Sequence, residues 1–177
     1  MHIRIAEPND LPEIVNIYNA AIPARQSTAD LEAVSVESRQ AWFTDRQMSK
    51  HPIWVATITD MNQGDVIIGW LSLQPFYDRS GYDKTAEISI YIRPNYQGQG
   101  VGRKLLQHLI EAAPTLDIDV LIGWIFAHNA PSLKLFQSLG FTQWGLLPQV
   151  ADLEGKRCDL VAMGLLLPKL EWEVKVD

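Results

Sequence analysis

The chain has 177 residues, of which 47% are hydrophobic and 20% are charged, and its formal net charge is −6. This length lies within the range of one domain and allows a substantial buried core. The acidic balance and the absence of a lysine and arginine cluster argue against a nucleic-acid partner, because neutralising phosphates drives such binding. A cationic or zwitterionic small molecule is compatible with this composition.

The sequence predicts neither a membrane segment, nor a disulfide, nor a metal site. Its first residues lack the basic segment and apolar core of a signal peptide, and no run approaches the ~18 apolar residues of a membrane span. We therefore expect a cytoplasmic protein with no membrane partner. Cys158 is the only cysteine, which excludes an intrachain disulfide, and the four histidines lack the spacing of metal ligands on a helix.

Hydrophobic periodicity predicts strands and helices along the first half of the chain. The predicted elements are a strand at 3–6, a helix at 11–22, a second helix that begins after Ser35 and includes Trp42 and Phe43, and strands at 53–59 and 66–74. Asn9 and Asp10 are candidate caps for the first helix, because short polar side chains accept hydrogen bonds from free backbone N–H groups. The polar stretch 23–34 resembles a loop or broken helix, and the turn-rich segment 62–65 suits a β-hairpin.

The second half of the chain follows the same alternation. Its predicted elements are an apolar strand at 86–92, a glycine-dense loop, an amphipathic helix at 102–113, a strand at 120–126, a helix after Asn129, and a final hairpin over 141–167 around Glu154 and Gly155. This order implies one α/β or α+β domain over residues 1–167, with a mixed, mostly antiparallel sheet and helices on both faces. Residues 168–177 are predicted to form a C-terminal tail.

The glycine-dense loop is the most informative motif. It reads Gln97-Gly98-Gln99-Gly100-Val101-Gly102 and connects a predicted strand to a predicted helix. Unpaired backbone N–H groups and the positive end of the helix dipole at such a junction favour an anion such as pyrophosphate. The spacing fits neither a P-loop, since no hydroxyl residue follows Arg103, nor a dinucleotide fingerprint, since the glycines alternate strictly.

The pattern of Gln97, Gly100 and Gly102 resembles the acetyl-coenzyme A signature of the GNAT superfamily of N-acetyltransferases. Asn129, Ser132 and the following Leu-Gly-Phe are similar to a second, downstream motif of that superfamily. Further matches resemble the phosphinothricin and methionine sulfoximine N-acetyltransferase group, at 4–18, 41–43, 85–92, 147–150 and 159–160. The resemblance implies a GNAT fold whose fourth and fifth strands splay apart, and an enzyme that uses acetyl-coenzyme A (acetyl-CoA) to acetylate an amine.

On this resemblance, acetyl-CoA is held by the fourth strand, the glycine loop, and the start of the helix after Asn129. The predicted cofactor-binding residues are Ile90, Tyr91, Ile92, Gln97, Gly98, Gln99, Gly100, Val101, Gly102, Arg103, Asn129 and Ser132. Asn129 has a second possible role as a helix cap, and the two roles are compatible. The family's acceptor loop matches residues 74–82, so Phe76, Arg79 and Tyr82 are predicted to bind the substrate, with Arg79 available for a carboxylate.

Side chains alternate along a strand, so Glu87, Ser89 and Tyr91 share one face of the fourth strand, and its three isoleucines pack on a helix from the other. Glu87 is the candidate general base, because a carboxylate can take the proton of an amine whose pKa is ~10. A carboxylate at the matching position is the proposed base in related acetyltransferases. The alternative is that Glu87 is solvated, or pairs with Arg79 or Lys84.

The resemblance has one departure that affects the mechanism. Phe136 stands where many family members have a tyrosine, and the phosphinothricin group often a histidine, as acid for the leaving thiolate. The predicted function is therefore direct, base-assisted acetylation of a small amino-acid-like amine, in a homodimer whose interface includes residues 160–167. A peptide or protein N-acetyltransferase and a non-catalytic acyl-CoA-binding module are the alternatives.

Overall fold

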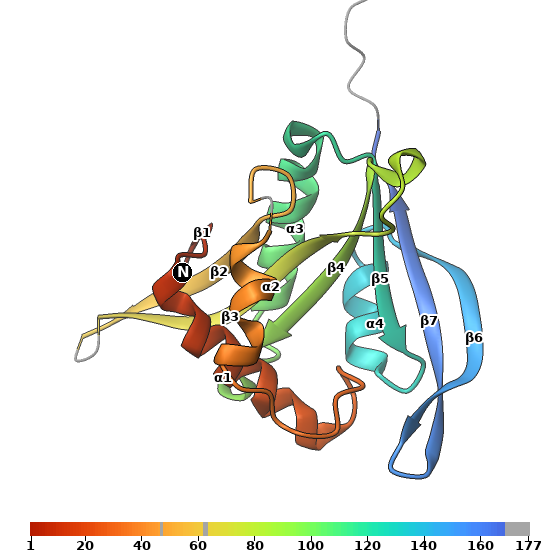
Figure 1. Ribbon diagram of the computed structural model, residues 1–177, viewed down its shortest axis with the longest axis horizontal. Helices are drawn as coiled ribbons and strands as arrows, with labels where there is room; N and C mark the ends of the chain where they lie inside the picture. The colour runs from red at the N-terminus through yellow and green to blue at the C-terminus, as the bar shows by residue number, and fades with distance from the viewer. Residues whose placement is uncertain (47, 62–63, 169–177) are drawn as a thin grey trace, which may run out of the picture.

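The computed structural model describes residues 1–46, 48–61 and 64–168 (Figure 1). Within them the chain forms a seven-stranded sheet in the order β1-β2-β3-β4-β5-β7-β6. The strands are β1 (His2–Ile5), β2 (Ile53–Asp60), β3 (Gly64–Pro75), β4 (Thr85–Ile92), β5 (Val120–Phe126), β6 (Thr142–Leu153) and β7 (Lys156–Leu166). All neighbouring pairs are antiparallel except β4 and β5, which run parallel. The predicted mixed, mostly antiparallel sheet is confirmed. Of the predicted tail, residues 169–177 lie outside the described part of the chain.

Helices cover both faces of the sheet, as the sequence predicted. They are α1 (Leu11–Ala21), α2 (Gln40–Thr44), α3 (Val101–Ala112) and α4 (Ala130–Gln137), joined by short 3-10 turns. In Figure 1, α1 and α2 lie in front of the sheet, and α3 and α4 lie behind it. Each face has its own apolar core, because β3 presents alternate side chains to each: Trp70 packs with α1, and Leu71 packs with α3.

The entry into α1 differs from the prediction. Asp10 does not cap α1, because residues 8–10 already form a 3-10 turn and the Asp10 carboxylate points back over it. There it accepts hydrogen bonds from the backbone N–H of Glu7 at 2.7 Å and from Nη1 of Arg4 at 2.6 Å. Asp10 thus ties β1 to the turn before α1. Ser35 accepts from the N–H of Ser38 at 3.1 Å and so begins the turn that leads into α2.

The sheet opens between β4 and β5. Their pairing runs from Thr85 opposite Val120 to Ile88 opposite Gly123. Beyond this point β4 stays paired with β3, and β5 stays paired with β7, so the two strands part towards their carboxyl ends (Figure 1). This confirms the predicted splay. At the point of parting, the buried ring of Phe136 from α4 packs directly on Gly123.

Gly123 offers a test of this packing. A Cβ on Gly123 would lie 2.4 Å from Cε1 of Phe136, a buried ring that would have to shift. We expect Gly123→Ala to lower the free energy of unfolding by about 1–3 kcal/mol, as overpacked core positions do, in urea denaturation. Gly145→Ala in β6 is the matched control, because its Cβ would meet Ala162 Cβ at an ordinary 3.9 Å. Equal effects of the two substitutions would contradict this account of the opening.

Candidate active site

A cavity of about 510 Å³, here called the larger cavity, lies where β4 and β5 part. It is lined by β4, β5, α4, the β6–β7 hairpin and the loop after α1. Five residues that the sequence predicted for the site line it together: Glu87, Ile90, Tyr91, Asn129 and Ser132. Phe136, in the position of the missing acid, lines it as well. The structure therefore brings together residues that are far apart in the sequence.

Glu87 is half-buried on the wall of this cavity. Burial raises the pKa of its carboxyl above the ordinary value, and a hydrogen bond from the Trp124 side chain on β5 opposes that rise. A general base works best when its pKa lies near the operating pH. The raised pKa of the Glu87 carboxyl lies closer to neutral pH than the ordinary value does. The alternative role as a partner of Lys84 is wrong, because Nζ of Lys84 lies 2.7 Å from Oδ1 of Asp117.

The alternation predicted for β4 is confirmed on both faces. A Cβ at Gly102 would lie 3.7 Å from Cγ1 of Ile92 and 3.8 Å from Cδ1 of Ile90, so these isoleucines face α3. Across the pair of β3 and β4, Gln74 stands opposite Glu87, and Trp70 stands opposite Tyr91. Residues directly opposite in a ladder share a face, so these four side chains look away from α3.

The glycine loop has the geometry of an anion site. Gly98 and Gly100 have φ values of 71° and 81°, which favour glycine, and nothing lies within 4 Å of a Cβ at either position. The side chains of Gln97 and Gln99 fold back, and their Nε2 atoms donate to the carbonyls of Ile92 at 3.2 Å and Asn95 at 2.8 Å.

The helix that follows the loop adds its own donors. α3 begins at Val101, where the first N–H groups of a helix have no partner within it. This open loop fits the pyrophosphate of a nucleotide cofactor. Arg103 is predicted to join that site through its backbone N–H, and its side chain donates from Nη1 to Oγ of Ser138 at 2.9 Å.

Asn129 has the capping role that the sequence offered as one of two. Its Oδ1 accepts from the N–H of Ser132 at 3.2 Å, at the start of α4, and its side chain is buried. Its Nδ2 donates at 2.9 Å to the carbonyl of Gln26. Asn129 therefore joins α4 to a loop about a hundred residues earlier in the chain.

That loop covers the larger cavity and was not recognised in the sequence. We call residues 25–30 the strap. The Tyr91 hydroxyl donates to the carbonyl of Ser27 at 2.9 Å, and Nε2 of His128 lies 2.8 Å from the carbonyl of Arg25. Nη2 of Arg25 also pairs with Glu154 in the β6–β7 turn at 2.9 Å. The sequence showed only a polar stretch here, because the bonds of the strap to β4, the start of α4 and the β6–β7 turn join residues far apart in the chain.

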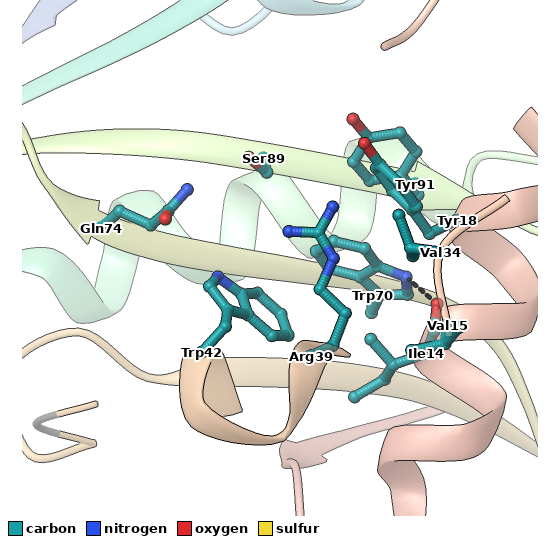
Figure 2. Close-up of a pocket in the computed structure, with 10 residues that line it drawn as sticks. All are labelled: Ile14, Val15, Tyr18, Val34, Arg39, Trp42, Trp70, Gln74, Ser89 and Tyr91. Carbon is teal, nitrogen blue, oxygen red and sulfur yellow. Dashed lines mark hydrogen bonds between the residues drawn. The ribbon is translucent and has the colours of Figure 1, made fainter. Parts of the chain in front are cut away.

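A second cavity of about 170 Å³, the smaller cavity, lies beside the first (Figure 2). Ser89 and Tyr91 line both cavities. The remaining lining residues come from α1, the loop after it, α2 with the turn before it, and β3: Ile14, Val15, Tyr18, Val34, Arg39, Trp42, Trp70 and Gln74. Of these eight residues, sequence analysis gave a site role only to Gln74, the first residue of the predicted acceptor loop. Strand alternation alone could have placed Trp70 and Gln74 on one face of β3. It could not have shown that Gln74 stands opposite Glu87, because that depends on the register between β3 and β4.

Beyond Gln74, the predicted acceptor loop does not line the cavity that contains Glu87. The rings of Phe76 and Tyr82 are 5.7 Å apart and pack with Tyr77 between β3 and β4. Tyr82 lines a third cavity of about 500 Å³, which shares Trp42 and Gln74 with the smaller cavity. Arg79 lines none of these three cavities.

This arrangement of an opened sheet, a glycine loop and a helix N-terminus matches known proteins. The model of the acetyltransferase (GNAT) family matches residues 11–141. The chain belongs to this family. YwnH of Bacillus subtilis is 46% identical over 164 residues, which cover 93% of this acetyltransferase and 98% of YwnH. The L-methionine sulfoximine/L-methionine sulfone acetyltransferase of Salmonella typhimurium is 35% identical over 167 residues, 94% of this chain and 95% of that protein.

Two solved structures connect this acetyltransferase to its cofactor. The structure of yncA from Salmonella typhimurium with its cofactor acetyl-CoA has a TM-score of 0.86 at 36% identity, covering 96% of this chain and 95% of that one. A GNAT phosphinothricin acetyltransferase from Sinorhizobium meliloti in complex with acetyl-CoA has a TM-score of 0.85 at 26% identity, covering 94% and 88%. The chain is an acetyl-CoA-dependent N-acetyltransferase of the phosphinothricin and methionine sulfoximine type.

Two other features bear on the site. Within residues 1–46, 48–61 and 64–168, the structure shows no group of three histidine, cysteine or acidic side chains that could hold a metal ion. In the same described part of the acetyltransferase, no helix has the length and apolar character needed to cross a membrane.

The environment of Glu87 predicts its titration. We expect the carboxyl pKa of Glu87, followed by carbon-13 NMR with Glu87→Gln to assign the signal, to lie above the ordinary 4.5. Trp124→Phe should raise it further, because the lost hydrogen bond stabilises the ionised form. A Glu87 that titrates at or below 4.5 would contradict the desolvated position described here.

Proposed function

We propose that this enzyme acetylates the amine of a small amino-acid-like acceptor, with Glu87 as the general base. The observation that supports this most is the position of Glu87 between two adjoining cavities. Glu87 lines the larger one, and Gln74, directly opposite it on β3, lines the smaller one. The relatives' names specify L-methionine sulfoximine, L-methionine sulfone and phosphinothricin as acceptors of those proteins, and all three are amino-acid-like.

The cofactor belongs on the side of the larger cavity. Acetyl-CoA supplies an activated acetyl thioester when bound. Backbone N–H groups around Gly98, Gly100 and the start of α3 hold the pyrophosphate in this proposal, since the open loop has room for it. The edge of β4 beyond Ile88, which has parted from β5, offers backbone groups to the pantetheine arm and an N–H near Tyr91 to the thioester oxygen.

Glu87 accepts the proton that the acceptor amine must lose before it can attack. An alkyl ammonium with a pKa of ~10 is almost wholly protonated at neutral pH, so removal of this proton is a large part of the task. The half-buried carboxyl of Glu87 suits this proton transfer, because its raised pKa reduces the difference between its own pKa and that of the amine. A thiol with a pKa of ~8.5 leaves without a strong acid, which is consistent with Phe136 at the position of the missing acid.

The size of the smaller cavity favours a free amino acid over a peptide. Its volume of about 170 Å³ is below the ~300–1,000 Å³ of sites for drug-sized ligands. Helices α1 and α2 close it on the side away from the sheet (Figure 2).

Mutation of the glycine loop tests the cofactor assignment. We expect Gly100→Val to weaken acetyl-CoA binding at least tenfold, about 1.4 kcal/mol, because a branched side chain would occupy the space for the phosphates. Calorimetric titration measures this. Gly64→Val is the matched control, because Gly64 also has a positive φ of 76° with open space around its Cβ, but lies in the β2–β3 turn. Unchanged affinity in folded Gly100→Val would remove the assignment.

Mutation of Glu87 tests the reaction. Glu87→Gln keeps the size and polarity of the side chain but cannot accept the proton, so we expect kcat/KM to fall ~10²-fold or more. Affinity for acetyl-CoA should stay the same, and the wild-type pH profile should lose activity as the pH falls through the raised pKa of Glu87. The measurement is thiol release with L-methionine sulfone. Wild-type turnover by Glu87→Gln across the pH range would assign the base elsewhere, with His128 next in line.

We also propose a homodimer, with its interface on strand β6 in place of the predicted residues 160–167. Strand β7, which contains most of the predicted interface 160–167, lies between β5 and β6, and its Val161 and Met163 are buried. The edge strand β6 instead exposes Leu146 and Val150 by about half.

Light scattering tests the dimer, and we expect twice the chain mass of 20.0 kDa. Leu146→Glu should shift the species towards monomer, because it places a charge on the exposed edge. A wild-type monomer at micromolar concentration would overturn the proposal.

A further inference from the structure

The smaller cavity has one charged lining residue, Arg39. Its other walls are aromatic, aliphatic or neutral polar side chains, including Trp42 from α2 and Trp70 from β3. Trp70 is fixed by a hydrogen bond from Nε1 to the carbonyl of Ile14 at 3.0 Å and by its ring contact with Tyr91 at 4.8 Å between centroids (Figure 2). A single cation inside a preformed pocket with mixed polar and apolar walls favours a ligand with one anionic group.

Arg39 is held in place but not fully used. Its Nη2 donates to Oδ2 of Asp30 at 3.0 Å, and its Cζ lies 5.2 Å from the centroid of the Tyr18 ring. Among the described residues no other hydrogen bond of this guanidinium is found. Figure 2 shows the guanidinium above Trp70, between Gln74 and Tyr18. A guanidinium has five N–H donors in a planar fork, so one bond to Asp30 leaves donors for a carboxylate.

A row of polar side chains leads from this cavity towards Glu87. Ser72 and Gln74 on β3 stand opposite Ser89 and Glu87 on β4 and share a face of the sheet. Oγ of Ser72 is buried and has no hydrogen-bond partner in the structure. Ser72 lines none of the three cavities, so Gln74 and Ser89 are the members of this row that an occupant of the smaller cavity can reach.

We propose that Arg39 binds the carboxylate of the acceptor and so makes the enzyme specific for free α-amino acids. An α-amino acid has its amine and its carboxylate on the same carbon. With the carboxylate on Arg39, the side chain lies against Trp42 and Trp70, and the amine faces Ser89 and Glu87. Arg39 takes the role that the sequence gave to Arg79, which lines none of the three cavities. This inference rests on the proposed function.

The test compares two acceptors that differ in charge alone. L-methionine sulfone has the carboxylate, and its primary amide has nearly the same shape without it. We expect the wild type to prefer the acid at least tenfold in kcat/KM. Arg39→Gln should raise KM for the acid at least tenfold, while kcat for the acid and KM for the amide stay within threefold. Arg39→Lys keeps the positive charge but loses the planar fork of donors, so its KM for the acid should lie between those of the wild type and Arg39→Gln.

Asp30→Ala separates carboxylate binding from a structural role of Arg39. It removes the acceptor of the Arg39 ion pair, while the Tyr18 hydroxyl keeps its 2.6 Å contact with Oγ1 of Thr28. If Arg39 only anchors the strap, Asp30→Ala reproduces Arg39→Gln. If Arg39 binds the acceptor, Asp30→Ala leaves KM for the acid unchanged or lower, because a competing anion is gone. Arg157→Gln, a surface arginine paired with Asp152 on the β6–β7 hairpin, controls for net charge.

The outcomes separate this inference from the proposed function. Equal activity of the wild type on acid and amide, or an acid-specific defect in Arg79→Gln but not in Arg39→Gln, would overturn the inference and leave the acetyltransferase assignment standing. Activity on neither compound would count against the proposed acceptor class. Titration of L-methionine sulfone into protein saturated with coenzyme A decides the role of Arg39 without turnover: an affinity tenfold lower in Arg39→Gln supports it, and equal affinities contradict it.

Discussion

The contact between Phe136 and Gly123 is the interaction on which the site depends. Parallel strands that stayed paired would bury the backbone groups of β4 in the ladder and leave no cavity between β4 and β5. The ring from α4 packs where the pairing ends, at a residue without a side chain. The residues that face the opening then include Glu87 on one strand and Trp124 on the other. A single aromatic residue placed for packing thus helps to define where chemistry takes place.

The electrostatics of the site follow from the same opening. A carboxylate on an exposed strand would keep its ordinary pKa, whereas Glu87 loses part of its hydration on the wall of a cavity. Arg39 lies in an acidic chain of net charge −6, and beyond its bond to Asp30 it still has N–H donors in the smaller cavity that can attract an anionic group. Opposite charges therefore occupy the two ends of the proposed acceptor path.

The sequence predicted the order of elements and the alternation on β4, because both depend on local periodicity, and its resemblance to the GNAT superfamily implied the splayed strands. It also predicted the glycine loop, whose positive φ values at Gly98 and Gly100 require glycine. It did not predict the smaller cavity, because Arg39, Trp70 and Tyr91 meet only once the register of β3 and the position of α2 are fixed. The cap assigned to Asp10 was wrong for a related reason: a turn before α1 redirected its carboxylate.

The strap links the two cavities energetically. Tyr91 lines both of them, and its hydroxyl holds the carbonyl of Ser27, while Asp30 at the other end of the strap holds Arg39. A ligand that shifts the strap in one cavity changes the affinity of the other for its own ligand. Thermodynamic linkage makes that change reciprocal, so through this short loop cofactor and acceptor alter each other's affinity by the same factor, whichever of them binds first.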